Sequence, residues 1–162
     1  MGKAVTALNT PNDTRYFYPA DGNRELKKLP FKASTAIAEG AAIGIEISSN
    51  TTTGNYTLMG TENATGADFV GIMAEPIVAT DADYATAGKL KGVRVPKTTF
   101  ARAYFYVGAG TFTAVDVGKT VEFHSDSLGL AVDTAGKGAR IVEYISSTRG
   151  ICVFTLPTTE TA

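Results

Sequence analysis

The sequence predicts an all-β fold built from two related halves. Three observations predict it. The chain of 162 residues contains 17 glycines, much threonine and no tryptophan, a composition that favours short strands and many turns. Several runs alternate apolar and polar residues with a period of two, which is typical of strands with one buried face. Parts of the chain also repeat one another, which indicates a duplicated β unit.

Residues 1–31 are expected to form an extended N-terminal arm. Turn-forming residues cluster at 9–13 and 19–23, and the proline at position 30 keeps the preceding residue extended. An aromatic cluster lies between the two turns, formed by Arg15, Tyr16, Phe17 and Tyr18. Aromatic rings contribute a large contact area at small entropic cost, so this cluster is a candidate anchor into a partner. The alternative is that the arm folds back over its own domain.

The first half is expected at about residues 33–96. Its clearest strand contains Ile43, Ile45 and Ile47, which alternate with small or polar residues and therefore share one face of a sheet. A polar loop at 49–54 separates this strand from the next. Further on, Pro76 ends a strand or places it at a sheet edge, because proline donates no ladder hydrogen bond.

Residues 98–107 are the longest strand candidate and are expected to link the two halves. The face expected to point into the core carries Ala101, Ala103, Phe105 and Val107. The opposite face carries Phe100, Arg102, Tyr104 and Tyr106. Aromatic rings and guanidinium groups are enriched in protein contact surfaces, so the second face is predicted to be a subunit or partner interface. The alternative is a sheet face half covered by neighbouring loops.

The second half, at about residues 111–157, repeats features of the first. Residues 35–45 and 113–123 share the pattern Thr-Ala-(Ile/Val) followed by a glycine and β-branched residues, without a gap. Two later segments also correspond: 69–75 with 139–143, across a one-residue gap, and 91–95 with 149–153. Glycines at 136 and 138 suit a tight hairpin turn. The last residues, 158–162, form a polar tail.

The charge and cysteine content exclude several classes of protein. A net charge of −1 without a long basic cluster argues against binding of nucleic acid. The start of the chain lacks the apolar core of a secretion signal, and no run approaches the roughly 20 apolar residues of a membrane span. We therefore expect assembly in a cytosol. The single cysteine, Cys152, cannot form an internal disulfide and is expected to be a small buried hydrophobe.

Residues that could carry chemistry are few, so the chain is not expected to be an enzyme or to hold a cofactor or metal. His124, Ser125 and Asp126 are triad residue types, but neighbours in an extended chain project to opposite sides, and a loop explains them better. One histidine and one cysteine are too few for a zinc site. The acidic pairs Asp81 with Asp83 and Asp13 with Asp21 lack the spacing of a calcium loop.

The segments 36–45 and 69–75, separated by a variable loop, resemble the capsid decoration, or cement, proteins of tailed bacteriophages. In that family a strand with a central glycine leads to a loop and then to a glycine-containing strand that ends in glutamate. The segments 117–123, 136–143 and 150–156 resemble the same pattern a second time. Two features depart from it, because the chain is longer than the smallest such proteins and the aromatic arm is not part of the shared pattern.

The resemblance implies a small β-barrel or tulip-like domain that binds the outer surface of a phage capsid. There it would stabilise the virion by bridging subunits of the major capsid protein, as a homotrimer assembled in the host bacterial cytoplasm. No nucleic acid, membrane or small-molecule substrate is implied. An alternative is another virion surface part, such as a head fibre base or a tail or fibre domain, which displays loops or binds glycans through Tyr56, Tyr84 and Tyr144.

Overall fold

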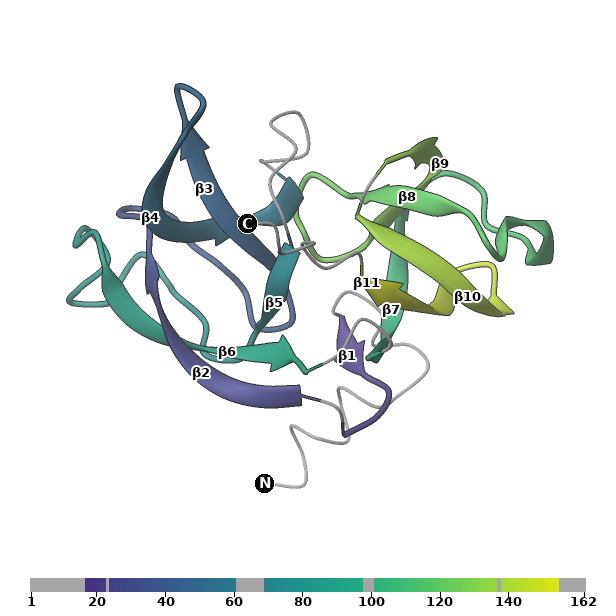
Figure 1. The fold of residues 1–162 in the computed structure, drawn as a ribbon, viewed down its shortest axis with the longest axis horizontal. Helices are drawn as coiled ribbons and strands as arrows, with labels where there is room; N and C mark the ends of the chain where they lie inside the picture. Colours follow the sequence, from purple (N-terminus) through teal and green to yellow (C-terminus); the bar gives the residue numbers. More distant parts are fainter. Residues whose placement is uncertain (1–16, 23, 61–68, 98–100, 137, 155–162) are drawn as a thin grey trace.

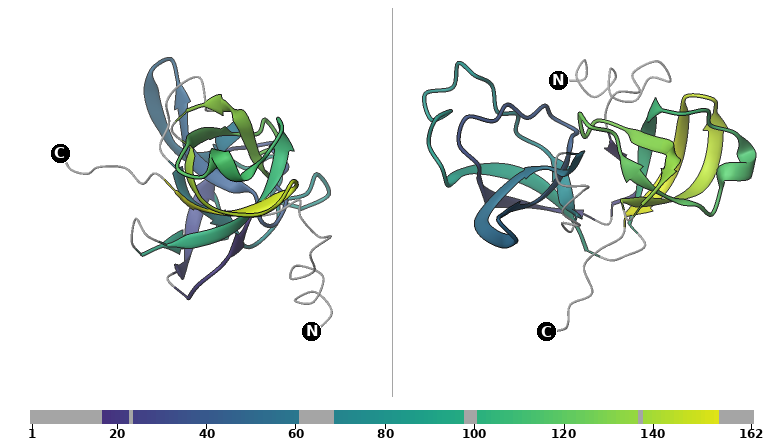
Figure 2. Two further views of the ribbon diagram at one scale, coloured as in Figure 1. Left: turned by 90° about the vertical axis from the view of Figure 1, so that its right-hand side faces the viewer. Right: turned by 90° about the horizontal axis from the view of Figure 1, so that it is seen from above.

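A computed structural model describes residues 17–22, 24–60, 69–97, 101–136 and 138–154. Within these residues the chain forms eleven strands and the short 3-10 helix η2 (Ala114–Asp116). The all-β prediction is therefore confirmed. Figures 1 and 2 show the strands gathered into two rings that lie side by side along the long axis of the molecule.

The first ring is a closed barrel of five strands in the order β2-β4-β3-β5-β6. β2 pairs with β6 in antiparallel fashion along its whole length and with β4 in parallel fashion at Phe31. The remaining neighbours are antiparallel. The five strands are β2 (Arg24–Phe31), β3 (Ala42–Ser48), β4 (Thr51–Leu58), β5 (Phe69–Met73) and β6 (Lys89–Pro96).

The second ring runs in the order β7-β11-β10-β8-β9 and closes because β9 pairs back onto β7 in parallel fashion. A short strand, β1 (Tyr18–Pro19), pairs with the N-terminal part of β7, before the residues of β7 that pair with β9. The five strands of the ring are β7 (Arg102–Ala109), β8 (Thr120–Phe123), β9 (Leu130–Ala135), β10 (Ala139–Ser146) and β11 (Arg149–Phe154).

The two barrels have the same topology, strand for strand, with β2 to β6 corresponding to β7 to β11. Their registers also agree. Ile43 lies opposite Gly71 in the first barrel, and Val121 lies opposite Ala139 in the second. Likewise Phe31 lies opposite Tyr56, and Val107 lies opposite Leu130. The halves are related as predicted, but each closes its own barrel instead of sharing one. The predicted match of 91–95 with 149–153 is displaced by one residue. The strand pairings make Val93 correspond to Cys152, and not to Ile151.

The expected boundaries need correction. The predicted arm over residues 1–31 includes β2, which is a full strand of the first barrel. Pro30 lies within β2, but one edge of this strand pairs only at Phe31, and such a strand tolerates proline. The predicted link over 98–107 is β7, the first strand of the second barrel. The second repeat therefore begins before residue 111. Residues 1–16 and 98–100 lie outside the described part.

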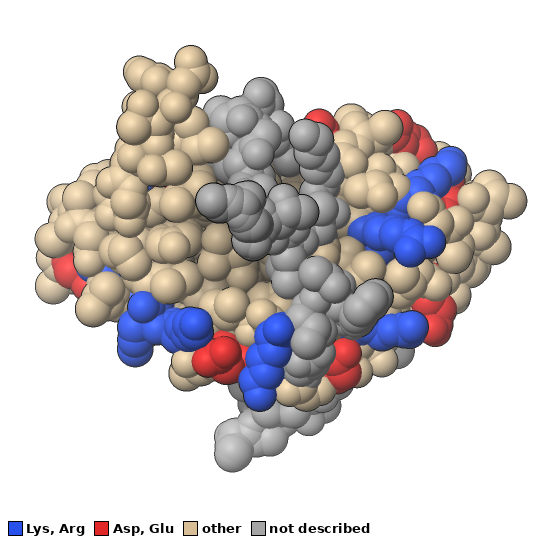
Figure 3. All heavy atoms as spheres, in the orientation of Figure 1, with Lys and Arg blue, Asp and Glu red and all other residues tan. Residues whose placement is uncertain are grey.

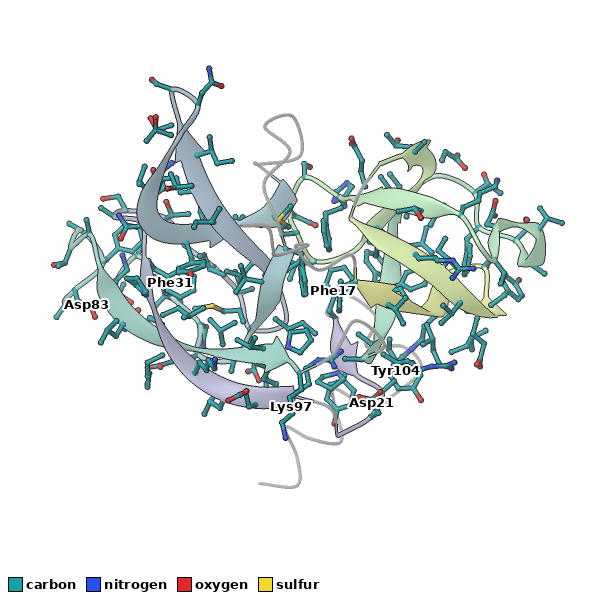
Figure 4. The ribbon with its side chains drawn as sticks, viewed as in Figure 1. Phe17, Asp21, Phe31, Asp83, Lys97 and Tyr104 are labelled. Atoms are coloured by element: carbon teal, nitrogen blue, oxygen red, sulfur yellow. The ribbon has the colours of Figure 1, made fainter. Side chains whose placement is uncertain are left out.

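Two hydrophobic clusters fill the molecule. One occupies the first barrel and includes Phe31, Ile37 and Met73. The other occupies the second barrel and continues across the junction between the barrels. At the junction the Phe69 ring from β5 stacks on the Phe154 ring from β11, with centroids 3.9 Å apart. Figure 4 shows Phe31 inside the first barrel and Phe17 between the two barrels.

The loop between β8 and β9 completes the junction. The carbonyl oxygen of Ser127 accepts a hydrogen bond from the backbone N–H of Ala42 at 2.8 Å, and the Ser127 hydroxyl accepts one from the N–H of Gly60 at 2.6 Å. The next residue, Leu128, packs against the core of the first barrel. This loop carries the residues His124 to Ser127, for which a loop was predicted.

Candidate functional site: an aromatic face on the second barrel

Two of the predicted contact residues meet on the outer surface of the second barrel. Pairing of β1 with β7 sets Tyr18 opposite Tyr104, and their rings stack with centroids 6.5 Å apart and an interplanar angle of 27°. On the next strand, β11, the guanidinium carbon of Arg149 lies 5.0 Å from the centroid of the Tyr104 ring. A guanidinium at this distance is attracted by the negative face of the ring. Tyr104 is therefore held between a second ring and a cation.

The predicted division of the middle strand into two faces is confirmed. Ala101, Ala103 and Phe105 are buried, and Val107 packs against the same core. On the other face the side chain of Arg102 is exposed, whereas Tyr104 and Tyr106 are half-buried. Phe100 lies outside the described residues. We call the outer group of Tyr18, Arg102, Tyr104, Tyr106 and Arg149 the aromatic face.

The backbone beneath the aromatic face is clamped by an ion pair. The backbone N–H of Arg102 donates to Oδ2 of Asp21 at 3.1 Å, and Nη2 of Arg24 donates to the carbonyl oxygen of Arg102 at 2.8 Å. Arg24 and Asp21 also face each other at 3.7 Å. Burial lowers the pKa of Arg24, and Asp21 partly offsets this effect. An arginine remains charged under such conditions, so the clamp persists at physiological pH. Figure 4 places Asp21 beside Tyr104.

The sequence predicts one anchor containing both Phe17 and Tyr18, but in the structure Phe17 points away from Tyr18, into the core. Its side chain is only 1% exposed and packs edge-on against Phe123 and Phe154 at the junction. Successive residues of an extended segment project to opposite sides, so Phe17 enters the core and Tyr18 stays at the surface. The ring of Phe17 therefore serves folding. Arg15 and Tyr16 lie outside the described residues.

Sequence reasoning missed Arg149 and the clamp formed by Arg24 and Asp21. The repeat did align Arg149 with Lys91, and alternation along β11 places Arg149 on the outer side. Neither signal shows that β11 adjoins β7, which is what brings the guanidinium onto the Tyr104 ring. In the first barrel the corrected register places Leu90, and not Lys91, at the position of Arg149.

The aromatic face has the composition of a protein contact surface. Its half-buried rings and the exposed side chain of Arg102 form an amphipathic surface, while Arg149 is only 9% exposed. Aromatic and arginine side chains often dominate the binding energy between proteins. Figure 3 shows acidic and basic side chains interspersed on the visible side of the molecule. Among the described residues there is no group of three or more histidine, cysteine or acidic side chains arranged to hold a metal ion.

The described part of the chain contains no helix of the length and apolarity needed to cross a membrane. A scan against models of protein families found no match, and a search of curated proteins found none either.

Proposed function

We propose that this protein is a structural part of a bacteriophage virion that binds the outer surface of the capsid and stabilises it by bridging major capsid subunits. The observation that carries the proposal is the duplication of one small barrel, with both copies fixed in a single orientation by the aromatic junction. A rigid pair of modules can contact neighbouring capsid subunits at a fixed spacing. Once one barrel is bound, the effective concentration of the other barrel at its own site is high, so two weak contacts together give tight binding.

The sequence pattern supports the same role. The segments that resemble phage decoration proteins include two corresponding pairs of strands, β3 with β8 and β5 with β10, and also β11. The net charge of −1 suits contact with protein surfaces better than contact with the genome. Under this proposal the protein is not an enzyme, acts as a homo-oligomer such as a trimer, and joins the capsid exterior in the host bacterial cytoplasm.

The aromatic face is the contact that we propose for the major capsid protein. Arg102 gives the cleanest test because its side chain is exposed, so its loss should leave the fold intact. Shells that lack this protein would be mixed with wild-type protein, Arg102→Ala or Tyr106→Ala, and the bound fraction measured by co-sedimentation. We expect both substitutions to raise the dissociation constant by about tenfold or more, as substitutions of central interface residues do. Melting temperatures should change little for Arg102→Ala.

The control is Leu90→Ala, which removes an exposed apolar side chain from the outer side of the first barrel. It should bind like the wild type. Equal binding by all variants would reject the aromatic face as the contact. A wild-type protein that does not sediment with shells would reject the capsid role itself, and binding to immobilised glycans would then favour a tail or fibre part.

A further inference from the structure

The two barrels contact each other through different surfaces. The β8–β9 loop of the second barrel rests on one end of the first barrel, where an apolar groove of about 620 Å³ is formed. The first barrel contributes residues from 36–39, Leu58 and 76–78, and the loop contributes Asp126 and Leu128. Within the groove Ile37 and Ile77 are bridged by two backbone hydrogen bonds and are 2% and 1% exposed.

The second barrel has the same end, but no described residue covers it. Ile37 corresponds to Val115 in the sequence repeat, and counting on from the matched strands β5 and β10 makes Ile77 correspond to Ile145. Val115 is 81% exposed and Ile145 is 45% exposed. The same correspondence matches Val117 to Glu39 and Tyr144 to Pro76, which line the groove of the first barrel, and both side chains are exposed. Together the four residues form what we call the end patch: Val115, Val117, Tyr144 and Ile145.

The end patch is built on a preorganised turn. Asp116 accepts hydrogen bonds from the backbone N–H of Thr113 at 2.8 Å and from Nζ of Lys119 at 2.6 Å. The carboxylate is therefore satisfied within the turn, and the Val115 side chain is presented outward. In Figure 1 the short coil of η2 lies at the right-hand extreme of the molecule, and the left view of Figure 2 faces this end.

The first barrel carries the matching loop. The β3–β4 hairpin occupies the position that the β8–β9 loop has in the second barrel. It is longer, since more residues separate the paired positions Ile45 and Tyr56 than separate Phe123 and Leu130. Its residues 48–54 are exposed and uncharged. Figure 3 shows this lobe at the upper left with no charged side chain on its visible side.

We propose that the end patch binds the β3–β4 hairpin of a second copy of this chain. This contact would repeat between molecules the contact that joins the two barrels within one molecule. Burial of the apolar side chains of the end patch, against the threonine methyl groups of the hairpin, would drive it. An uncharged hairpin also loses no ionic hydration on docking. A contact between two different surfaces produces a ring or a filament. The inference deepens the proposed capsid role by naming the surfaces of self-assembly, and it is tested without capsids.

Disulfide cross-linking tests the proposed pair of surfaces. A double variant with Val115→Cys and Thr51→Cys places one thiol in the end patch and one beside the tip of the hairpin. The native Cys152 does not compete, because it is fully buried and burial raises the pKa of its thiol. Under mild oxidation we expect covalent dimers and higher multiples of the chain mass. The control combines Val115→Cys with Leu26→Cys, an exposed site on β2, and should remain mostly monomeric.

Light scattering gives a second measurement that needs no cysteine. Wild-type protein should show an average mass above that of one chain. Val115→Asp should lower the association constant at least severalfold, and so lower the average mass, while leaving the circular dichroism spectrum unchanged. A wild-type chain that stays monomeric at high concentration would overturn the proposal. Cross-linking of Val115→Cys alone as efficient as that of the double variant would also overturn it, because the patches would then face each other. Neither result depends on binding to capsids.

Discussion

At the scale of single residues, Gly60 shows how closely the two barrels approach. A Cβ atom at this position would collide with the carbonyl oxygens of His124 and Ser125 on the docked loop. We predict that Gly60→Ala lowers the free energy of unfolding by about 1–3 kcal/mol, as for other overpacked sites, measured by urea denaturation. The control is Gly22→Ala, where the added methyl group meets nothing within 4 Å. Equal effects of the two substitutions would contradict the close approach.

At the scale of elements, the η2 turn should lose stability in acid. The hydrogen bonds from Lys119 and from the Thr113 backbone hold the pKa of Asp116 below its usual value. A lowered pKa contributes stability above the unfolded pKa, and this contribution is lost as the pH falls through the folded pKa. We predict that Asp116→Asn destabilises the protein at pH 7 and that the difference from wild type shrinks below about pH 4. Urea denaturation across this range measures it.

The matched control for Asp116 is Glu25→Gln, which neutralises an exposed carboxylate on β2. A difference between Asp116→Asn and wild type that grows as the solution becomes more acidic would show that the turn does not depend on the ionised carboxylate. The same turn presents Val115, so loss of the turn should also weaken the self-assembly proposed above.

At the scale of the whole molecule, the aromatic junction should make the barrels unfold together. Phe69 contacts both Phe154 and Phe123 across the junction. We predict one thermal transition for wild type, seen at the same temperature by circular dichroism and by labelling of Cys152 with a thiol reagent. Phe69→Ala should cost about 3–5 kcal/mol and separate the two signals. Phe69→Leu retains most of the apolar volume and should keep one transition at a lower temperature.

If Phe69→Ala left the circular dichroism and labelling curves superimposed, cooperativity between the barrels would not depend on the rings. The β8–β9 loop, with the hydrogen bonds of Ser127 to Ala42 and Gly60, would then be the element that couples them.

Features that depend on near neighbours in the chain could be predicted from the sequence. The period of two along the middle strand gave the inward residues Ala103 and Phe105 and the outward residue Arg102, because alternate side chains of a strand project to opposite sides. Local similarity also revealed the duplication, and the alternating apolar run around Cys152 predicted its burial. These features follow from spacing along the chain, so no distant contact is needed to infer them.

Which strands meet could be learned only from the folded chain. Parallel pairing of β2 with β4 and of β7 with β9 closes two barrels where one was expected, and no local pattern distinguishes these closures. The placement of Arg149 on the Tyr104 ring and of Phe17 in the junction has the same origin. Each depends on segments far apart in sequence, whose pairing is selected by the total apolar surface that the closed barrels bury.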